Sequence, residues 1–300
     1  MSAGPAGAVA APGRWLAVAA LLFNAFSFGV SWWPFRQISA LGLHPLWLTG
    51  ISYAFAVALL LLWRPAALVE LWRTPSLWAL MGAAGVTNAC FNWAVSFGDV
   101  VRVVLLFYLM PLWAVLLAWW LLGERISARG ALRVALALAG AVVVLWPADA
   151  GAWPLPRNLA EGLAVLGGIS FALNNVMLRR EARRGEVARS LAMFLGGALV
   201  ALLLAGLLTQ QGLAAPPPAA GWHWLAAAAG LALWFLAANL ALQHGAALLP
   251  ANSTSVILIT ELLFATVSAL ALGAGTLGLR EGLGALMIIG AAVLAALQVD

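Results

Sequence analysis

The sequence carries very little charge, and this excludes most classes of soluble protein. Only 8% of its 300 residues are Asp, Glu, Lys or Arg, whereas 65% are apolar. A soluble domain carries about 25% charged residues. With so little polar surface the chain cannot remain in water, so we predict an integral membrane protein whose main partner is membrane lipid.

Cysteine is nearly absent and lysine is entirely absent. The single cysteine, Cys90, lies in an apolar run, so no intramolecular disulfide can form and a packing role is expected. All fifteen basic residues are Arg, and they stand in short turns between apolar runs rather than in one patch. We therefore predict no nucleic-acid partner and interpret the arginines as signals of membrane orientation.

Residue groups that support catalysis are missing as well. The three histidines, His44, His223 and His244, stand near the ends of apolar runs and do not form a metal-binding pair. The sequence has no Gly-x-Ser-x-Gly elbow, no Gly-Lys-Ser phosphate loop and no cluster of carboxylates. We expect a protein that is not an enzyme and that has no catalytic residue, metal or cofactor.

Long apolar runs dominate what the chain does contain. A helix that crosses the hydrocarbon core needs about 20 apolar residues. This length predicts an all-α protein with ten transmembrane helices, at residues 15–36, 45–63, 76–98, 101–122, 128–146, 158–179, 190–209, 222–244, 251–273 and 278–298.

The placement of arginine predicts the orientation. With the N-terminus inside, eleven arginines lie in cytoplasmic segments, and the outer segments hold only Arg36, Arg102, Arg157 and Arg280. This is a clear positive-inside bias, which places both termini in the cytoplasm. We expect a multi-pass protein of the cell inner membrane with a disordered cytoplasmic tail at residues 1–14.

A faint internal repeat divides the ten predicted spans into five and five. Leu105–Val144 resembles Ser255–Leu294 at an offset of half the chain, and eight of the forty aligned residues are identical. Five spans begin and end on opposite sides, so a second copy must enter the membrane inverted. We predict two inverted five-helix repeats, 15–146 and 158–298, joined by a periplasmic connector at 147–157 and enclosing a central cavity.

Polar side chains deep in the predicted spans occur at helical spacing. Asn24 and Ser27 are three residues apart, and Asn88 and Asn92 are four apart, so each pair shares a helix face. The sixth and eighth spans contribute Ser170, Asn174, Asn175, Asn239 and Gln243. Such residues either hydrogen-bond a neighbouring helix, at roughly 0.6–2 kcal/mol each, or bind a solute. Their occurrence in both halves favours binding.

Glu261 is the one acid that cannot be assigned to a membrane edge. A buried carboxyl group must be paired, hydrated or protonated, so it contacts a substrate amine, carries a proton, forms part of a gate or bonds a neighbouring helix. The repeat aligns it with Pro111, which leaves the Phe107 carbonyl without its usual helical donor. Pro111 is therefore a candidate gate or hinge.

Aromatic residues within the spans or at their outer ends form a second group. They are Trp32, Trp33, Trp93, Phe107, Tyr108, Trp113, Phe171, Trp234 and Phe235. Most are expected to pack or to face lipid, and those close to the amides are candidates to line an amphipathic cavity.

The stretch Tyr108-Leu-Met-Pro111-Leu-Trp, followed by Gly123-Glu-Arg, Gly130 and Gly140, resembles the EamA-type ten-span members of the drug/metabolite transporter superfamily. The resemblance covers residues 15–298. It implies ten helices in inverted repeats, a central cavity and export from the cytoplasm.

The second half departs from the family pattern. Ala274 replaces the acid of Gly-Glu, and Glu261 replaces the proline. With the tryptophan content and the Asn24/Ser27 face, this departure is most similar to the YddG-type aromatic amino-acid exporters. By position, the family cavity implies as substrate-binding residues Asn24, Ser27, Asn92, Tyr108, Met110, Phe171, Asn174, Asn239 and Glu261.

The function expected from the resemblance is export of aromatic or bulky apolar amino acids and related metabolites by alternating access. We expect a monomer that binds a small-molecule substrate. One alternative is a carrier of another solute class, such as a drug cation, a nucleotide sugar or a lipid-linked substrate. A second is a membrane enzyme or assembly protein, which the missing catalytic groups disfavour.

Overall fold

The structure is a computed structural model that describes most of the chain. The described residues are 11–122, 128–146, 155–181, 183–218, 221–249, 254 and 257–296. Residues 1–10 of the predicted tail (1–14) and residues 147–154 of the predicted connector (147–157) lie outside them. The first helix begins at Ala11, four residues before the predicted start of the first span.

The prediction of an all-helical protein is confirmed for the described residues. The helices are α1 (Ala11–Gly29), α2 (Trp32–Ala40), α3 (Pro45–Trp63), α4 (Ala66–Arg73), α5 (Pro75–Phe97), α6 (Val100–Phe107), α7 (Met110–Leu122), α8 (Ala128–Leu145), α9 (Leu159–Arg180), α10 (Glu186–Gln210), α11 (Trp222–Leu248), α13 (Thr260–Ala271) and α14 (Leu279–Ala296).

Six segments of the described chain are long and apolar enough to cross a membrane. They are Trp15–Ala40, Pro45–Trp63, Val100–Leu117, Leu159–Leu178, Glu186–Gln210 and Trp222–Gly245, and two shorter apolar helices are Gly130–Leu145 and Thr260–Ala271. Each falls on a predicted span. These helices indicate a multi-pass membrane protein, whereas the number ten and the direction of the termini stay predictions.

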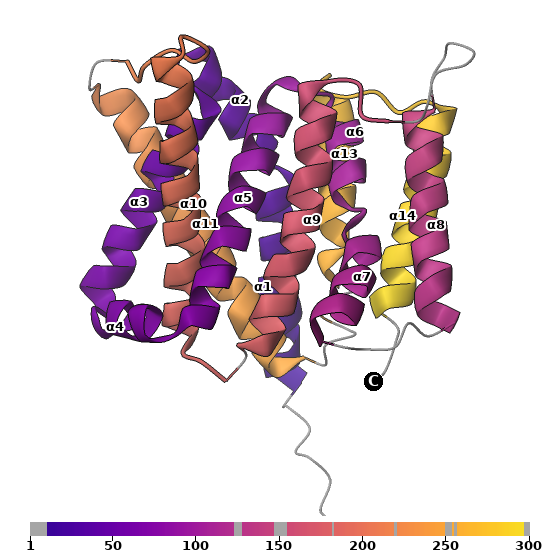
Figure 1. The fold of residues 1–300 in the computed structure, drawn as a ribbon, viewed down its shortest axis with the longest axis horizontal. Coiled ribbons are helices and arrows are strands. Elements are labelled where there is room, and N and C mark those ends of the chain that lie inside the picture. The colour runs from indigo at the N-terminus through magenta and orange to yellow at the C-terminus, as the bar shows by residue number, and fades with distance from the viewer. Residues whose placement is uncertain are drawn as a thin grey trace, which may run out of the picture.

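The helices stand side by side in one elongated bundle (Figure 1). At one edge α3 packs against α10, and at the other α8 packs against α14. Between them α5 packs against both α9 and α10, and α1 packs against α11 and α13. The start of α1 and the end of α14 lie at the same end of the bundle (Figure 1).

Helix α4 was not predicted. It lies across the lower end of the bundle in Figure 1, between α3 and α5. Ala67 and Leu71 are buried, whereas Trp72 is 62% exposed and Val69 is 50% exposed. This two-faced pattern is typical of a helix lying in the membrane interface. A search for runs of about 20 apolar residues does not detect so short a helix.

His44 caps α3. Its Nδ1 accepts a hydrogen bond of 3.2 Å from the backbone N–H of Leu46, and burial lowers the pKa of His44 below its ordinary value of 6.5. Between the folded and unfolded pKa values, His44 binds more protons in the unfolded chain than in the folded protein. The stability associated with neutral His44 is therefore fully present above its unfolded pKa and is lost as the pH falls through its lower, folded pKa. We expect a lower midpoint of thermal unfolding in detergent at about pH 5 than at about pH 8. His44→Asn, which keeps an acceptor, should remove part of that pH dependence; an unchanged pH dependence would contradict the assignment.

Candidate functional site

In three of the predicted spans the helix is broken, although the sequence stays apolar through the break. The first breaks between α1 and α2, where the Ser31 hydroxyl donates a hydrogen bond of 2.7 Å to the Phe28 carbonyl. The fourth breaks between α6 and α7, and the ninth just before α13. At that last break the Thr260 hydroxyl donates a hydrogen bond of 2.6 Å to the Ile257 carbonyl. Side-chain bonds of this kind compete with regular helical hydrogen bonds.

The α6–α7 break lies immediately before the predicted hinge proline. Helix α6 ends at Phe107 and α7 begins at Met110, so Pro111 occupies the second residue of α7 and Tyr108 lies in the link. A proline is tolerated in a first helical turn because its missing N–H would have no helical partner there. The helix is interrupted just before the proline, and the role of Pro111 as a gate or hinge stays a prediction. The Pro111 side chain lies outside the described part of the structure.

Glycines of neighbouring helices lie against two of these breaks. A Cβ atom placed on Gly168 of α9 would lie 2.6 Å from the Phe107 carbonyl oxygen, and one on Gly29 of α1 would lie 2.7 Å from the Glu261 carbonyl oxygen. Only glycine permits backbones to approach this closely. The break before α7 is thus packed against α9, and the break before α13 is packed against α1.

Tyr108 and Glu261 bring these two breaks together. Tyr108 is only 6% exposed, and its hydroxyl interacts with the carboxyl group of Glu261. Glu261 lies in the first turn of α13 rather than at the middle of a continuous helix. A carboxylate is favoured there because unpaired backbone N–H groups give a helix N-terminus a partial positive charge.

Helix α9 adds aromatic and amide groups beside the α6–α7 break. Phe171 stacks on Phe107 with ring centroids 5.2 Å apart, and the Asn175 amide donates a hydrogen bond of 3.6 Å to the Met110 sulfur. Asn174 is 1% exposed, and its amide oxygen has no hydrogen-bond partner among the described residues. An unsatisfied buried acceptor is costly, which makes it a candidate to receive a hydrogen bond from a ligand.

The remaining predicted amides are bonded to neighbouring helices. The Asn24 amide donates to the Ala238 carbonyl at 2.9 Å, and the Asn92 amide donates to the Thr49 hydroxyl at 3.2 Å. The Asn239 amide oxygen accepts from the Ser190 hydroxyl at 2.9 Å and from the Gln243 amide at 2.9 Å. The contacts of these three residues therefore agree with the first interpretation, in which a polar side chain hydrogen-bonds a neighbouring helix.

The structure therefore divides the nine predicted binding residues into two groups. Tyr108, Met110, Phe171, Asn174 and Glu261 lie on the two breaks and on α9, which packs against α6 and α7. The others lie on α1, α5 and α11, and they are Asn24, Ser27, Asn92 and Asn239.

The sequence did not single out Tyr53, whose hydroxyl donates a hydrogen bond of 2.6 Å to the Asn88 amide oxygen. Its ring makes edge contacts with Phe194 and Phe235, at centroid distances of 5.2 and 5.9 Å. The signal for it was present: Thr49 and Tyr53 are four residues apart, as are Asn88 and Asn92. Matched spacing on two spans predicts two polar faces that meet.

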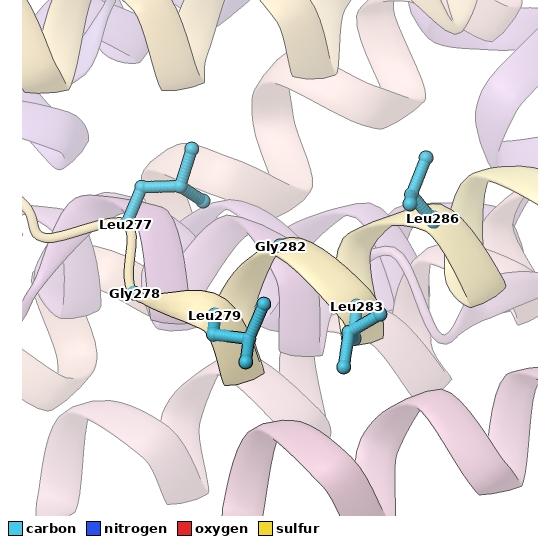
Figure 2. Close-up of a pocket in the computed structure, with 6 residues that line it drawn as sticks. All are labelled: Leu277, Gly278, Leu279, Gly282, Leu283 and Leu286. Carbon is cyan, nitrogen blue, oxygen red and sulfur yellow. The ribbon is translucent and has the colours of Figure 1, made fainter.

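Two hollows on the described surface are almost entirely apolar. A depression of about 560 Å³ lies along the start of α14 (Figure 2), lined by Leu277, Gly278, Leu279, Gly282, Leu283 and Leu286. Leu279 is 81% exposed and Leu286 is 70% exposed, which is typical of a surface that faces lipid. A groove of about 430 Å³ between α1–α2, α11 and α13 includes Ser27, Trp33 and Trp234. The α14 depression has no charged or polar side chain to hold a polar solute.

Comparison with known proteins places the first half of the chain among transporter sequences. Residues 15–146 match the model of the EamA-like transporter family, and no curated protein matches the chain. A solved structure described as "Crystal structure of protein" has a TM-score of 0.51 and 19% identity over 95% of this chain and 96% of its own. That likeness concerns the fold alone. Together the apolar helices and the family match indicate a multi-pass membrane protein that is related, over residues 15–146, to the EamA-like transporters of the drug/metabolite transporter superfamily.

Proposed function

We propose that this protein exports aromatic or bulky apolar amino acids and related metabolites across the cell inner membrane by alternating access. The observation that carries the proposal is the contact between Tyr108 and Glu261. One residue comes from each proposed half, and the contact lies where both halves interrupt a helix. Substrate sites near the midplane, built from discontinuous helices of two repeats, are a recurring feature of secondary transporters.

The packing of the helices supports two inverted repeats, 15–146 and 158–298. If α1–α8 and α9–α14 are related by the repeat, α5 corresponds to α11 and α9 corresponds to α1. The contact of α5 with α9 then requires an equivalent contact of α11 with α1, and both contacts are observed. A Cβ on Gly98, the C-cap of α5, would lie 2.6 Å from Ala160, and one on Gly245 of α11 would lie 2.5 Å from Leu21. The family match supports the division too, since it has the bounds of the first proposed repeat.

The groups around the two breaks suit an apolar amino acid. The Glu261 carboxylate provides a charge for the substrate ammonium group, and the Tyr108 hydroxyl orients that carboxylate. The Asn175 amide offers N–H donors for the substrate carboxylate. Phe107 and Phe171, stacked 5.2 Å apart, provide the apolar surface on which a substrate side chain would pack.

Transport by purified protein in liposomes tests this proposal. We expect labelled Phe, Trp or Met to move down its gradient faster than in protein-free liposomes, with unlabelled amino acid competing. A matched panel should contain an organic cation and a nucleotide sugar. Movement of the cation or the nucleotide sugar without any of the three amino acids would overturn the substrate assignment and favour another carrier of the same superfamily.

The alternative of a phosphorylated substrate is disfavoured by the position of the arginines. Arg102 and Arg280 stand in the first turns of α6 and α14, Arg157 stands just before α9, and Arg36 bonds the Val95 and Gly98 carbonyls at the end of α5. Within the described structure Glu261 interacts with Tyr108 and has no arginine partner, whereas phosphate recognition depends on such cations.

A further inference from the structure

A polar cluster lies where three helices begin at the upper end of the bundle in Figure 1. Arg102 is in the first turn of α6, Glu161 in the first turn of α9 and Glu281 in the first turn of α14. Asp99 is the N-cap of α6, and Thr276 lies in the link between α13 and α14. We call these five residues the Arg102 cluster. In the proposed orientation it lies at the outer face.

Contacts within the Arg102 cluster join the two proposed halves. The Arg102 guanidinium lies 3.0 Å from the Glu161 carboxylate and 3.3 Å from the Glu281 carboxylate. The Asp99 carboxylate accepts hydrogen bonds from the Thr276 backbone N–H at 2.9 Å and from the Thr276 hydroxyl at 3.2 Å. Arg102 and Asp99 belong to the first half, and their partners belong to the second.

Each acid of the cluster also has a partner close to it in the sequence. Glu161 accepts a hydrogen bond of 3.0 Å from the backbone N–H of Arg157, and Glu281 accepts one of 3.1 Å from that of Gly278. Asp99 accepts one of 3.0 Å from the backbone N–H of Arg102. These capping bonds and the partial positive charge of the helix N-termini do not depend on the other half. If the halves separate at this end, each carboxylate therefore keeps at least one partner.

The burial of the charges suits a contact that forms and breaks. The Arg102 side chain is 25% exposed, and those of Glu161 and Glu281 are 7% and 15% exposed. A buried ion pair adds little net stability, because the loss of hydration offsets the attraction, but it demands specific partners. When the end opens, water replaces the lost ionic partners, so the closed and open states differ little in free energy.

Two further bonds extend the same junction. The Val100 backbone N–H donates to the Ala274 carbonyl at 3.1 Å, and the Trp32 indole N–H donates to the Ser268 hydroxyl at 2.9 Å. Both again connect the first half with α13 or the residues that follow it. The start of α6 is thereby held between α9 and the α13–α14 link.

We propose that the Arg102 cluster is the outer latch of the transporter: it closes the outer end in the structure described and separates when the substrate is released outside. This inference rests on the proposed function, because outward opening is a step of export. It assigns a role to Arg102, Glu161 and Glu281, which lie apart from the proposed substrate contacts.

The latch is tested first by thiol accessibility, which needs no substrate. In a Cys90→Ala background, Val104→Cys places a reporter at a residue that is 2% exposed and two residues after Arg102. We expect Arg102→Gln to raise its labelling by a membrane-impermeant maleimide, added outside, roughly tenfold, since weakening closed-state contacts shifts the population toward the open state. Arg102→Lys should give a smaller rise. Arg64→Gln, at the other end of the bundle, is the matched control. Labelling equal to that of the control would overturn the latch.

A disulfide provides the converse test. Asp99→Cys with Thr276→Cys, again without Cys90, joins two side chains that are in hydrogen-bonding contact. Oxidation should stop transport and lower reporter labelling, and a reductant should restore both, whereas each single variant should not respond. Transport that continues through the oxidised pair would contradict the latch. A labelling response without transport of any amino acid would instead overturn the substrate assignment and leave the latch supported.

Discussion

Replacing Glu261 with Gln is expected to reduce amino-acid transport roughly tenfold to a hundredfold, because a hydrogen bond to a charged group contributes about 1.5–3 kcal/mol. The substitution keeps the size of the side chain and removes the charge offered to the substrate ammonium group. Initial rates of labelled Phe or Trp movement in liposomes measure the effect. Glu186→Gln is the matched control, because Glu186 occupies the equivalent first turn of α10 and is exposed.

Tyr108→Phe separates two explanations of that loss. If Tyr108 acts by orienting the Glu261 carboxylate, removing its hydroxyl should lower transport by less than Glu261→Gln does. The double variant should then be no worse than Glu261→Gln alone, since the effects of contacting residues are not additive. Full activity of Glu261→Gln would assign the contact a packing role and remove the main support for the proposed site.

Hydropathy predicts the spans of this protein well where local signals end them. The predicted span 45–63 coincides with α3 because His44 and Pro45 begin the helix and Arg64 follows its end. The breaks at residues 30–31 and 108–109 do not show in hydropathy, since the sequence stays apolar through them. Where α6 ends depends on Gly168, which admits close packing of α9 against the Phe107 carbonyl. A tertiary contact of this kind is not visible in the local sequence.

The candidate site shows the same difference between local and distant information. Glu261 stands out in sequence because an acid within an apolar run is rare. Tyr53 escaped notice because its ring counts as apolar, and its role depends on Asn88, which lies 35 residues away. Arg102 reads as an ordinary residue of a membrane edge. Its partners Glu161 and Glu281 lie 59 and 179 residues away, so only the fold brings them together.

Gly196→Ala is expected to give the largest loss of stability. A Cβ atom at Gly196 of α10 would clash with the Met81 carbonyl oxygen of α5, which is backbone and cannot move without separating the helices. Overpacking of this kind typically costs 1–3 kcal/mol, and we expect about 3 kcal/mol or more. The midpoint of thermal unfolding in detergent should fall accordingly.

Gly206→Ala is the control that isolates the crowding. It lies in the same helix, and a Cβ atom there would meet nothing within 4 Å. Alanine is a better helix former than glycine, so Gly206→Ala should leave the protein unchanged or stabilise it by about 0.5–1 kcal/mol. Similar midpoints for the two variants would show that α5 and α10 do not approach each other at Gly196. The pairing of these helices joins the two proposed halves, so that result would also remove one contact on which the arrangement of the halves depends.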